Sequence, residues 1–210
     1  RDAQGELTSS PKVTMIRAMN YPGGKGKCYQ RLINLMPPHT TYIESHLGGG
    51  AVLRHKRPAQ RNIGIDVDAS VINSWELLYP EHCMLVHGDA VSFLETYAFN
   101  GEELVYADPP YLPSVRRRSK IYRHEYSYAD HERLLAVLKD LPCKVMLSGY
   151  DSLKYRKHLA GWRMVTFPAK THVDVRTECV WMNFAPATAL HDGAHLGNSF
   201  RERQTIKRRH

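Results

Sequence analysis

Residues 41–51, with the sequence TYIESHLGGGA, pass from a short apolar run into a glycine-rich loop. The apolar run at 41–44 predicts a buried strand, with Glu44 at its carboxyl end. The three glycines that follow allow a tight turn and let the backbone approach a ligand closely. A helix predicted at 51–55 would aim its first amides at that ligand. The stretch therefore predicts the start of an α/β fold that binds a ligand at a strand end.

The same alternation of strand and helix continues along the chain. Further strands are predicted at 62–66, 84–87, 104–107, 144–148, 163–167 and 178–184, and further helices at 69–78, 90–97 and 128–141. Repeated strand–helix units predict a mostly parallel sheet with right-handed crossovers. Ligands bind such sheets at the carboxyl ends of the strands, so the acids and glycines found there become candidate site residues. They are Glu44, Gly48, Gly50, Asp66, Asp89 and Asp108.

Length and charge set the organisation of the chain. We predict one folded domain over 20–186, a flexible leader at 1–19 and a basic C-terminal tail at 187–210. The formal net charge of +8 favours a polyanionic partner such as nucleic acid. No apolar run approaches the ~18 residues of a membrane span, so we expect no membrane partner.

The cysteines and histidines show no metal-binding pattern. The four cysteines stand far apart without a CxxC pair, which indicates neither a zinc site nor a disulfide framework. The twelve histidines are scattered along the chain and have no HExxH spacing. We therefore expect no metal, and isolated cysteines are typical of a reducing, cytoplasmic setting.

Two of the strand-end acids have two interpretations each. Asp66 follows the second predicted strand, where a carboxylate commonly accepts hydrogen bonds from ribose hydroxyls. Asp89 follows the third, where it would lie beside the adenine of a nucleotide-like cofactor. Either acid could instead cap the helix that follows it, and Asp68 could share that role with Asp66.

The most specific feature is Asp108-Pro109-Pro110-Tyr111, directly after the predicted strand at 104–107. Two prolines remove two backbone donors and fix φ, so the loop is stiff and its carbonyls stay free. An amino group on an aromatic ring is a poor nucleophile that needs an acceptor for each N–H. The Asp108 carboxylate and the Pro109 carbonyl suit that need, and Tyr111 offers a face for a base that has left the duplex. The alternative, a surface turn, does not explain the acid and the aromatic ring.

The ordered motifs resemble those of Dam-like DNA adenine methyltransferases over about residues 20–184. The matching pieces are YPGGK at 21–25, YIE at 42–44, GGGAV at 48–52, Asp66, Gly88-Asp89, Asp108–Tyr111, LSGY at 147–150, and TE at 177–178 with WMN at 181–183. The resemblance implies a Rossmann-like class I S-adenosylmethionine-dependent methyltransferase fold. Its sheet would be seven-stranded, mostly parallel and flanked by helices.

The resemblance also implies roles for individual residues. Tyr21 and Lys25 would lie against the methionine end of S-adenosylmethionine, and Asp66 would bind its ribose. Glu44 could hold the amino group or a ribose hydroxyl, and Asp108 would face both cofactor and target. Ser45-His46 departs from the Pro-Phe usual in the family, which alters part of the cofactor wall.

Only residues 90–107 separate Asp89 from the Asp108 loop, so the target-recognition segment usual in the family is absent there. A basic run after the loop is the obvious substitute, because its cations and Tyr122 fit a phosphate-gripping, base-supporting loop. Its candidate nucleic-acid-binding residues are Arg116, Arg117, Arg118, Lys120, Tyr122 and Arg123. A solvated charged loop is the alternative.

The motifs predict direct transfer of a methyl group from sulfonium to the N6 of adenine in DNA. Other acceptors remain open: adenine in RNA, cytosine N4 or a protein glutamine amide. Asp108 in the first position of the loop favours adenine. A non-catalytic nucleic-acid-binding module is the rival from another class, and the intact Lys25, Asp66 and Asp108–Tyr111 loop argue against it.

Overall fold

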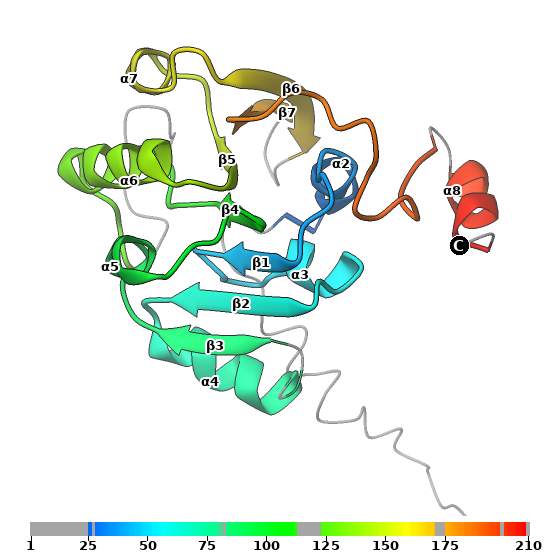
Figure 1. The fold of residues 1–210 in the computed structure, drawn as a ribbon, viewed down its shortest axis with the longest axis horizontal. Helices are drawn as coiled ribbons and strands as arrows, with labels where there is room; N and C mark the ends of the chain where they lie inside the picture. The colour runs from blue at the N-terminus through cyan, green and yellow to red at the C-terminus, as the bar shows by residue number, and fades with distance from the viewer. Residues whose placement is uncertain are drawn as a thin grey trace, which may run out of the picture.

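The computed structural model describes residues 25–26, 28–79, 81, 83–112, 123–170, 175–197 and 200–208. A single sheet runs through its centre in the order β3-β2-β1-β4-β5-β7-β6 (Figure 1). Its strands are β1 Thr41–Glu44, β2 Arg61–Asp66, β3 Met84–His87, β4 Glu103–Ala107, β5 Lys144–Gly149, β6 Arg163–Lys170 and β7 Val175–Met182. Strands β1 to β5 pair in parallel, and β7 runs antiparallel between β5 and β6. The predicted seven-stranded, mostly parallel sheet is confirmed.

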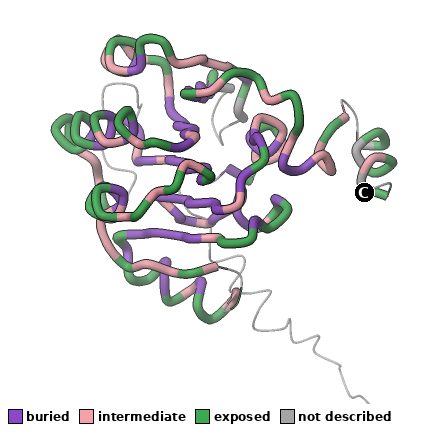
Figure 2. The backbone as a smooth tube through the Cα atoms, viewed as in Figure 1, coloured by how far each residue is buried: buried purple, intermediate pink, exposed green. Residues whose placement is uncertain are grey.

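Side chains of the central strands alternate between two cores because successive residues of a strand point to opposite faces. On β1, Tyr42 packs in one core and Ile43 in the other. On β4, Tyr106 belongs to the first core and Val105 to the second. Figure 2 shows the result, strands buried along most of their length. Burial on both faces explains why these strands read as continuous apolar runs in the sequence.

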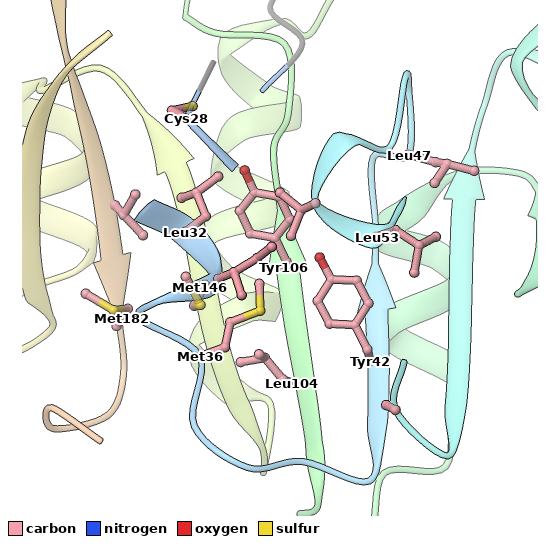
Figure 3. Packing of buried hydrophobic residues seen from close by; sticks show 14 of the residues in the cluster. Cys28, Leu32, Met36, Tyr42, Leu47, Leu53, Leu104, Tyr106, Met146 and Met182 are labelled. Atoms are coloured by element: carbon pink, nitrogen blue, oxygen red, sulfur yellow. The ribbon is translucent and has the colours of Figure 1, made fainter. Parts of the chain in front are cut away.

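Helices cover both faces of the sheet. The first core is closed by α2 Tyr29–Ile33, α3 Ala51–His55 and α4 Ala69–Leu78. The second is closed by α5 Ala90–Thr96, α6 Tyr128–Asp140 and α7 Leu153–His158. Leu32 of α2 lies against Tyr106 and Met146 of the sheet in Figure 3. None of the helices in the described part of the chain is long and apolar enough to cross a membrane.

The C-terminal segment differs from the predicted tail. Residues 187–197 are described, and His191 and Asp192 within them are buried. The His191 amide donates to the Met36 carbonyl at 2.9 Å, and Asp192 accepts from the Arg57 amide at 2.8 Å. The chain then forms α8, Phe200–Lys207, on the side of α2 (Figure 1). Hydrogen bonds of its polar side chains and backbone hold residues 187–197 against the folded domain. A hydropathy pattern does not report such bonds, so the sequence predicted a tail.

Several predictions fall outside the described residues. They are the flexible leader at 1–19, Tyr21, and the basic-run residues Arg116, Arg117, Arg118, Lys120 and Tyr122.

Candidate active site

A cavity of about 450 Å³ opens at the carboxyl ends of the parallel strands. It lies beside β1 and β4, the neighbouring strands at which the strand order reverses. Ligands of open α/β sheets bind at such a switch point, and the volume falls within the range of small-molecule sites. All the cofactor-site residues predicted within the described part of the chain line this cavity. They are Lys25, Glu44, Gly48, Gly50, Asp66, Asp89 and Asp108.

The glycine loop between β1 and α3 forms one wall of the cavity. Gly50 has a φ of 53°, in the left-handed region that favours glycine, and a Cβ there would come within 2.0 Å of the Trp75 ring. The Trp75 indole N–H donates to the Gly48 carbonyl at 3.0 Å, and the Gly48 amide donates to Asp66 at 2.8 Å. Glycine at position 50 and the ring of Trp75 therefore fix the loop from behind.

Asp66 shapes this wall as well as lining it. One carboxylate oxygen accepts from Gly48, and the other accepts from the Asp68 amide at 2.9 Å. Asp66 therefore joins the glycine loop to the start of α4. A role in binding ribose stays a prediction.

Asp68 and Asp89 cap helices, in agreement with one interpretation of the sequence. The Asp68 side chain accepts from the Ser70 amide at the start of α4, and Asp89 accepts from the Ser92 amide at the start of α5. Capping does not remove Asp89 from the cavity wall, so its two predicted roles are compatible.

Lys25 and Asp108 form a buried ion pair at the floor of the cavity. Lys25 Nζ lies 2.7 Å from Asp108 Oδ1, and the side chains are 6% and 17% exposed. Burial by itself would lower the pKa of Lys25, but the charges of Asp108 and Glu178 outweigh it and raise that pKa. Lys25 therefore stays protonated, and its ammonium group remains paired with Oδ1, one of the two carboxylate oxygens of Asp108.

Tyr111 occupies a different place from the one that base stacking requires. Its ring is 6% exposed, packs edge-on against Tyr150 with centroids 4.6 Å apart, and is not among the residues that line the cavity. Its hydroxyl lies between Lys25 and Glu178. In this structure the ring offers no open face to a base, so the predicted stacking requires Tyr111 to leave the cluster.

Glu178 of β7 is a member of this cluster that the sequence did not single out as a site residue. It is buried, lies 3.2 Å from Lys25 Nζ and accepts a hydrogen bond from the Tyr111 hydroxyl. An acid at the start of the predicted strand at 178–184 was the available signal, and only the sheet order brings it to Asp108.

Glu44 lies deeper in the cavity wall than its predicted role suggests. It is 3% exposed and accepts from the Tyr42 hydroxyl at 2.9 Å and from the Leu53 amide at 3.0 Å. Burial, with a contribution from the charge of Asp108, raises the pKa of Glu44 to about 8. Near neutral pH it is therefore largely uncharged, which favours binding a hydroxyl over binding a cationic amino group.

Residues 123–126 line the cavity on the side reached after the basic run. Arg123 donates to both carboxylate oxygens of Asp68, at 3.1 and 3.0 Å. The Tyr126 hydroxyl lies 2.9 Å from His46 Nε2. Arg123 was predicted to bind nucleic acid. In this structure its guanidinium is engaged by Asp68, because the helix cap carries a charge that the sequence pattern did not connect to it.

Burial lowers the pKa of His46 to about 3, so its ring is neutral. His46, which together with Ser45 stands where the resembled family usually has Pro-Phe, makes a polar contact with Tyr126.

No group of His, Cys, Asp and Glu side chains in the described ranges is arranged to hold a metal ion.

A family model matches the central part of the chain. Residues 80–167 match the model of the D12 class N6 adenine-specific DNA methyltransferase family. The match runs from β3 through the Asp108 loop into β6, and it confirms the resemblance to Dam-like enzymes over that range. No curated protein is a significant match to the sequence.

Solved structures resemble most of the fold. A methyltransferase from Geobacter sulfurreducens is 12% identical, with a TM-score of 0.55 over 85% of this chain and 90% of that chain. A precorrin 8W decarboxylase from Methanobacterium thermoautotrophicum is 12% identical, with a TM-score of 0.50 over 79% and 94%. At this identity the likeness shows the fold alone. It confirms the predicted Rossmann-like class I methyltransferase fold.

Proposed function

We propose that the chain is an S-adenosylmethionine-dependent methyltransferase that methylates the N6 amino group of adenine in DNA. The observation that carries the proposal is the buried Lys25–Asp108 pair at the cavity floor, followed by Pro109 and Pro110 on the same wall. The match of residues 80–167 to a DNA adenine methyltransferase family supports the choice of base and polymer.

The cavity residues fit the cofactor. Gly48 and Gly50 let the backbone come close to it, and the acids Asp66 and Asp89 can accept hydrogen bonds from its ribose hydroxyls and adenine amino group. Lys25 would lie against the methionine half, and Glu44 would bind a ribose hydroxyl. The bound cofactor would supply a methyl group on a positively charged sulfur.

The chain contributes position and electrostatics to the transfer. The Asp108 carboxylate would accept one N–H of the target amino group and the Pro109 carbonyl the other, which orients the nitrogen toward the methyl group. No strong base is needed, because the proton leaves after the nitrogen has become cationic. Lys25 holds the Asp108 carboxylate in place from the opposite side.

The nucleic acid would bind through the basic run that ends at Arg123. Residues 116–118 are consecutive arginines, separated from the Asp108–Tyr111 loop by four residues. Cations there would contact phosphates and bring the target base to the loop, with affinity that falls steeply with salt. The short connection between Asp89 and Asp108 favours little sequence readout, and it leaves RNA as the second candidate substrate.

The test is transfer of a labelled methyl group from S-adenosylmethionine to unmethylated duplex DNA and to RNA, followed by nucleoside analysis. We expect label in N6-methyl-2′-deoxyadenosine. Label in N4-methylcytosine would contradict the choice of base, and label in RNA alone would contradict the choice of polymer. Absence of label from both polymers would contradict nucleic-acid methylation itself.

A further inference from the structure

Glu178 is a buried acid that the proposed transfer does not use. It stands on β7 and is 4% exposed. A buried carboxylate is costly unless it is paired, and its partners are the Lys25 ammonium and the Tyr111 hydroxyl. Both partners also contact Asp108. Glu178 is therefore linked to the Asp108 carboxylate through Lys25 and Tyr111, each of which contacts both acids.

The chemistry of the three partners fixes the direction of their hydrogen bonds. An ammonium group only donates, so the Tyr111 oxygen accepts from Lys25. The single Tyr111 proton then goes to Glu178, which lies closer to the hydroxyl than Asp108 Oδ1 does at 3.3 Å. Glu178 thus keeps the Tyr111 proton away from Asp108.

The contacts of Lys25 and Tyr111 with Asp108 fall on the same oxygen, Oδ1. An amino group that reaches Asp108 from the cavity is therefore expected at Oδ2. If Glu178 lost its charge, the Tyr111 proton could turn to Asp108, and Lys25 would lose one of its two carboxylates. Both changes would weaken or displace the acceptor that the amino group needs.

We propose that Glu178 is a positioning residue, which holds Lys25 and Tyr111 on the Oδ1 side of Asp108 and keeps Oδ2 for the acceptor amino group. The inference rests on the proposed methyl transfer. Glu178 itself touches neither the cavity nor, by this account, the reacting atoms.

The proposal has a signature in the pH dependence of the reaction. Burial raises the pKa of Asp108, the charge of Lys25 lowers it, and the charge of Glu178 raises it. Other titratable groups coupled to Asp108 or Glu178 are Cys28, Tyr42, Glu44, Tyr106, Tyr155 and Cys179. They are unchanged in a Glu178→Gln variant. Removing the Glu178 charge should therefore lower the pKa of Asp108. The acid limb of the plot of kcat against pH should move to lower pH with it.

The experiment compares wild type, Glu178→Gln and a control, Glu76→Gln, whose side chain is exposed on α4. We would measure kcat and the KM for DNA from pH 5 to 9, and the Kd of S-adenosylhomocysteine by calorimetry. We expect Glu178→Gln to lower kcat on the order of 10²-fold, as small misplacements of reacting groups do. KM and Kd should change little, the acid limb should move to lower pH, and Glu76→Gln should match wild type.

The outcomes separate this inference from the proposed function. An inactive wild type would overturn the proposed function and the inference with it. An active wild type with an unchanged kcat in Glu178→Gln, or with a lower kcat but an unmoved acid limb, would overturn the inference alone.

If Glu178→Gln does not fold, Glu178→Asp takes its place. It keeps the charge but withdraws it from Tyr111, so kcat should fall while the acid limb stays where it is in wild type. An unchanged kcat in Glu178→Asp would overturn the inference.

Discussion

Glu44 shows how a single residue of the site couples folding to pH. Its pKa in the folded chain is raised to about 8 from an ordinary value of 4.5. The folded state therefore binds the proton more tightly than the unfolded state does. This contribution to stability is complete below pH 4.5 and is lost as the pH rises through 8.

We predict that Glu44→Gln removes this dependence, because glutamine keeps an oxygen for Tyr42 and Leu53 but cannot ionise. Relative to wild type, its free energy of unfolding should rise by about 1.4 kcal/mol for each pH unit between 4.5 and 8. Urea unfolding at pH 5, 6.5 and 8 measures the difference. A difference that does not vary with pH, like the one expected for exposed Glu76→Gln, would contradict the prediction.

Some site residues could be predicted from the sequence and others could not. Asp108 and the two prolines stand together in one short loop, so their joint chemistry is visible locally. Glu178 reaches them only because β7 inserts beside β5, and no local pattern reports that insertion. The position of Tyr111 likewise depends on Glu178 and Tyr150, which are distant in the sequence.

Among the elements, the loop between β1 and α3 depends most strictly on its sequence. Gly50 combines a positive φ with direct contact to Trp75, and Trp75 also holds the Gly48 carbonyl. The loop can therefore keep its shape only while position 50 has no side chain.

Gly50→Ala should destabilise the chain by about 1–2 kcal/mol for the left-handed backbone and a further ~1–3 kcal/mol for overpacking against Trp75. It should also weaken cofactor binding, because the loop lines the cavity. Thermal unfolding and calorimetry with S-adenosylhomocysteine measure the two effects.

Gly161→Ala is the matched control for this prediction. Gly161 has a φ of 87°, with nothing near its missing Cβ. This variant should show only the backbone cost and keep cofactor affinity. Equal behaviour of the two variants would contradict the account of the loop.

The parallel strands were predicted to within a residue at each end, and in the central ones burial on both faces leaves an unambiguous apolar run. The antiparallel pair was predicted less accurately. Strand β6 extends to Lys170 and β7 starts at Val175, beyond the predicted 163–167 and 178–184, because pairing with each other sustains polar residues. Strand β7 ends before Asn183, whose side chain caps the start of β5 instead. The short helices α2 and α7 were not predicted, since five or six residues carry too little periodicity, whereas the equally short α3 was predicted from the glycine loop before it.

At the scale of the whole molecule, positive charge is not confined to the cavity side. The formal net charge is +8, and on the side of α2 the helix α8 carries the exposed Arg201 and is followed by the exposed Arg208 (Figure 1). Four residues separate the arginines at 116–118 from the end of the Asp108–Tyr111 loop. We therefore expect contact with phosphate near the site to come from the basic run.

Replacing Arg116, Arg117 and Arg118 with Gln should weaken DNA binding and flatten its salt dependence by about 0.9 in slope for each phosphate that the variant no longer neutralises. Fluorescence anisotropy at several salt concentrations measures the slope. A control variant replaces Arg61, Lys139 and Lys157 with Gln. It removes the same number of charges at exposed positions outside the cavity lining. If both variants had the same slope, or the first kept that of wild type, the basic run would not lie on phosphate.

The central claim is that Asp108 is the acceptor that enables methyl transfer to adenine N6. It is tested most directly by the rate at which N6-methyl-2′-deoxyadenosine forms in unmethylated DNA with wild type, Asp108→Ala and an exposed control, Asp140→Ala. The account predicts product with wild type and Asp140→Ala, and none with Asp108→Ala. The Asp108→Ala variant should still fold and keep most of its affinity for the cofactor. Product formation at the wild-type rate by Asp108→Ala would contradict it.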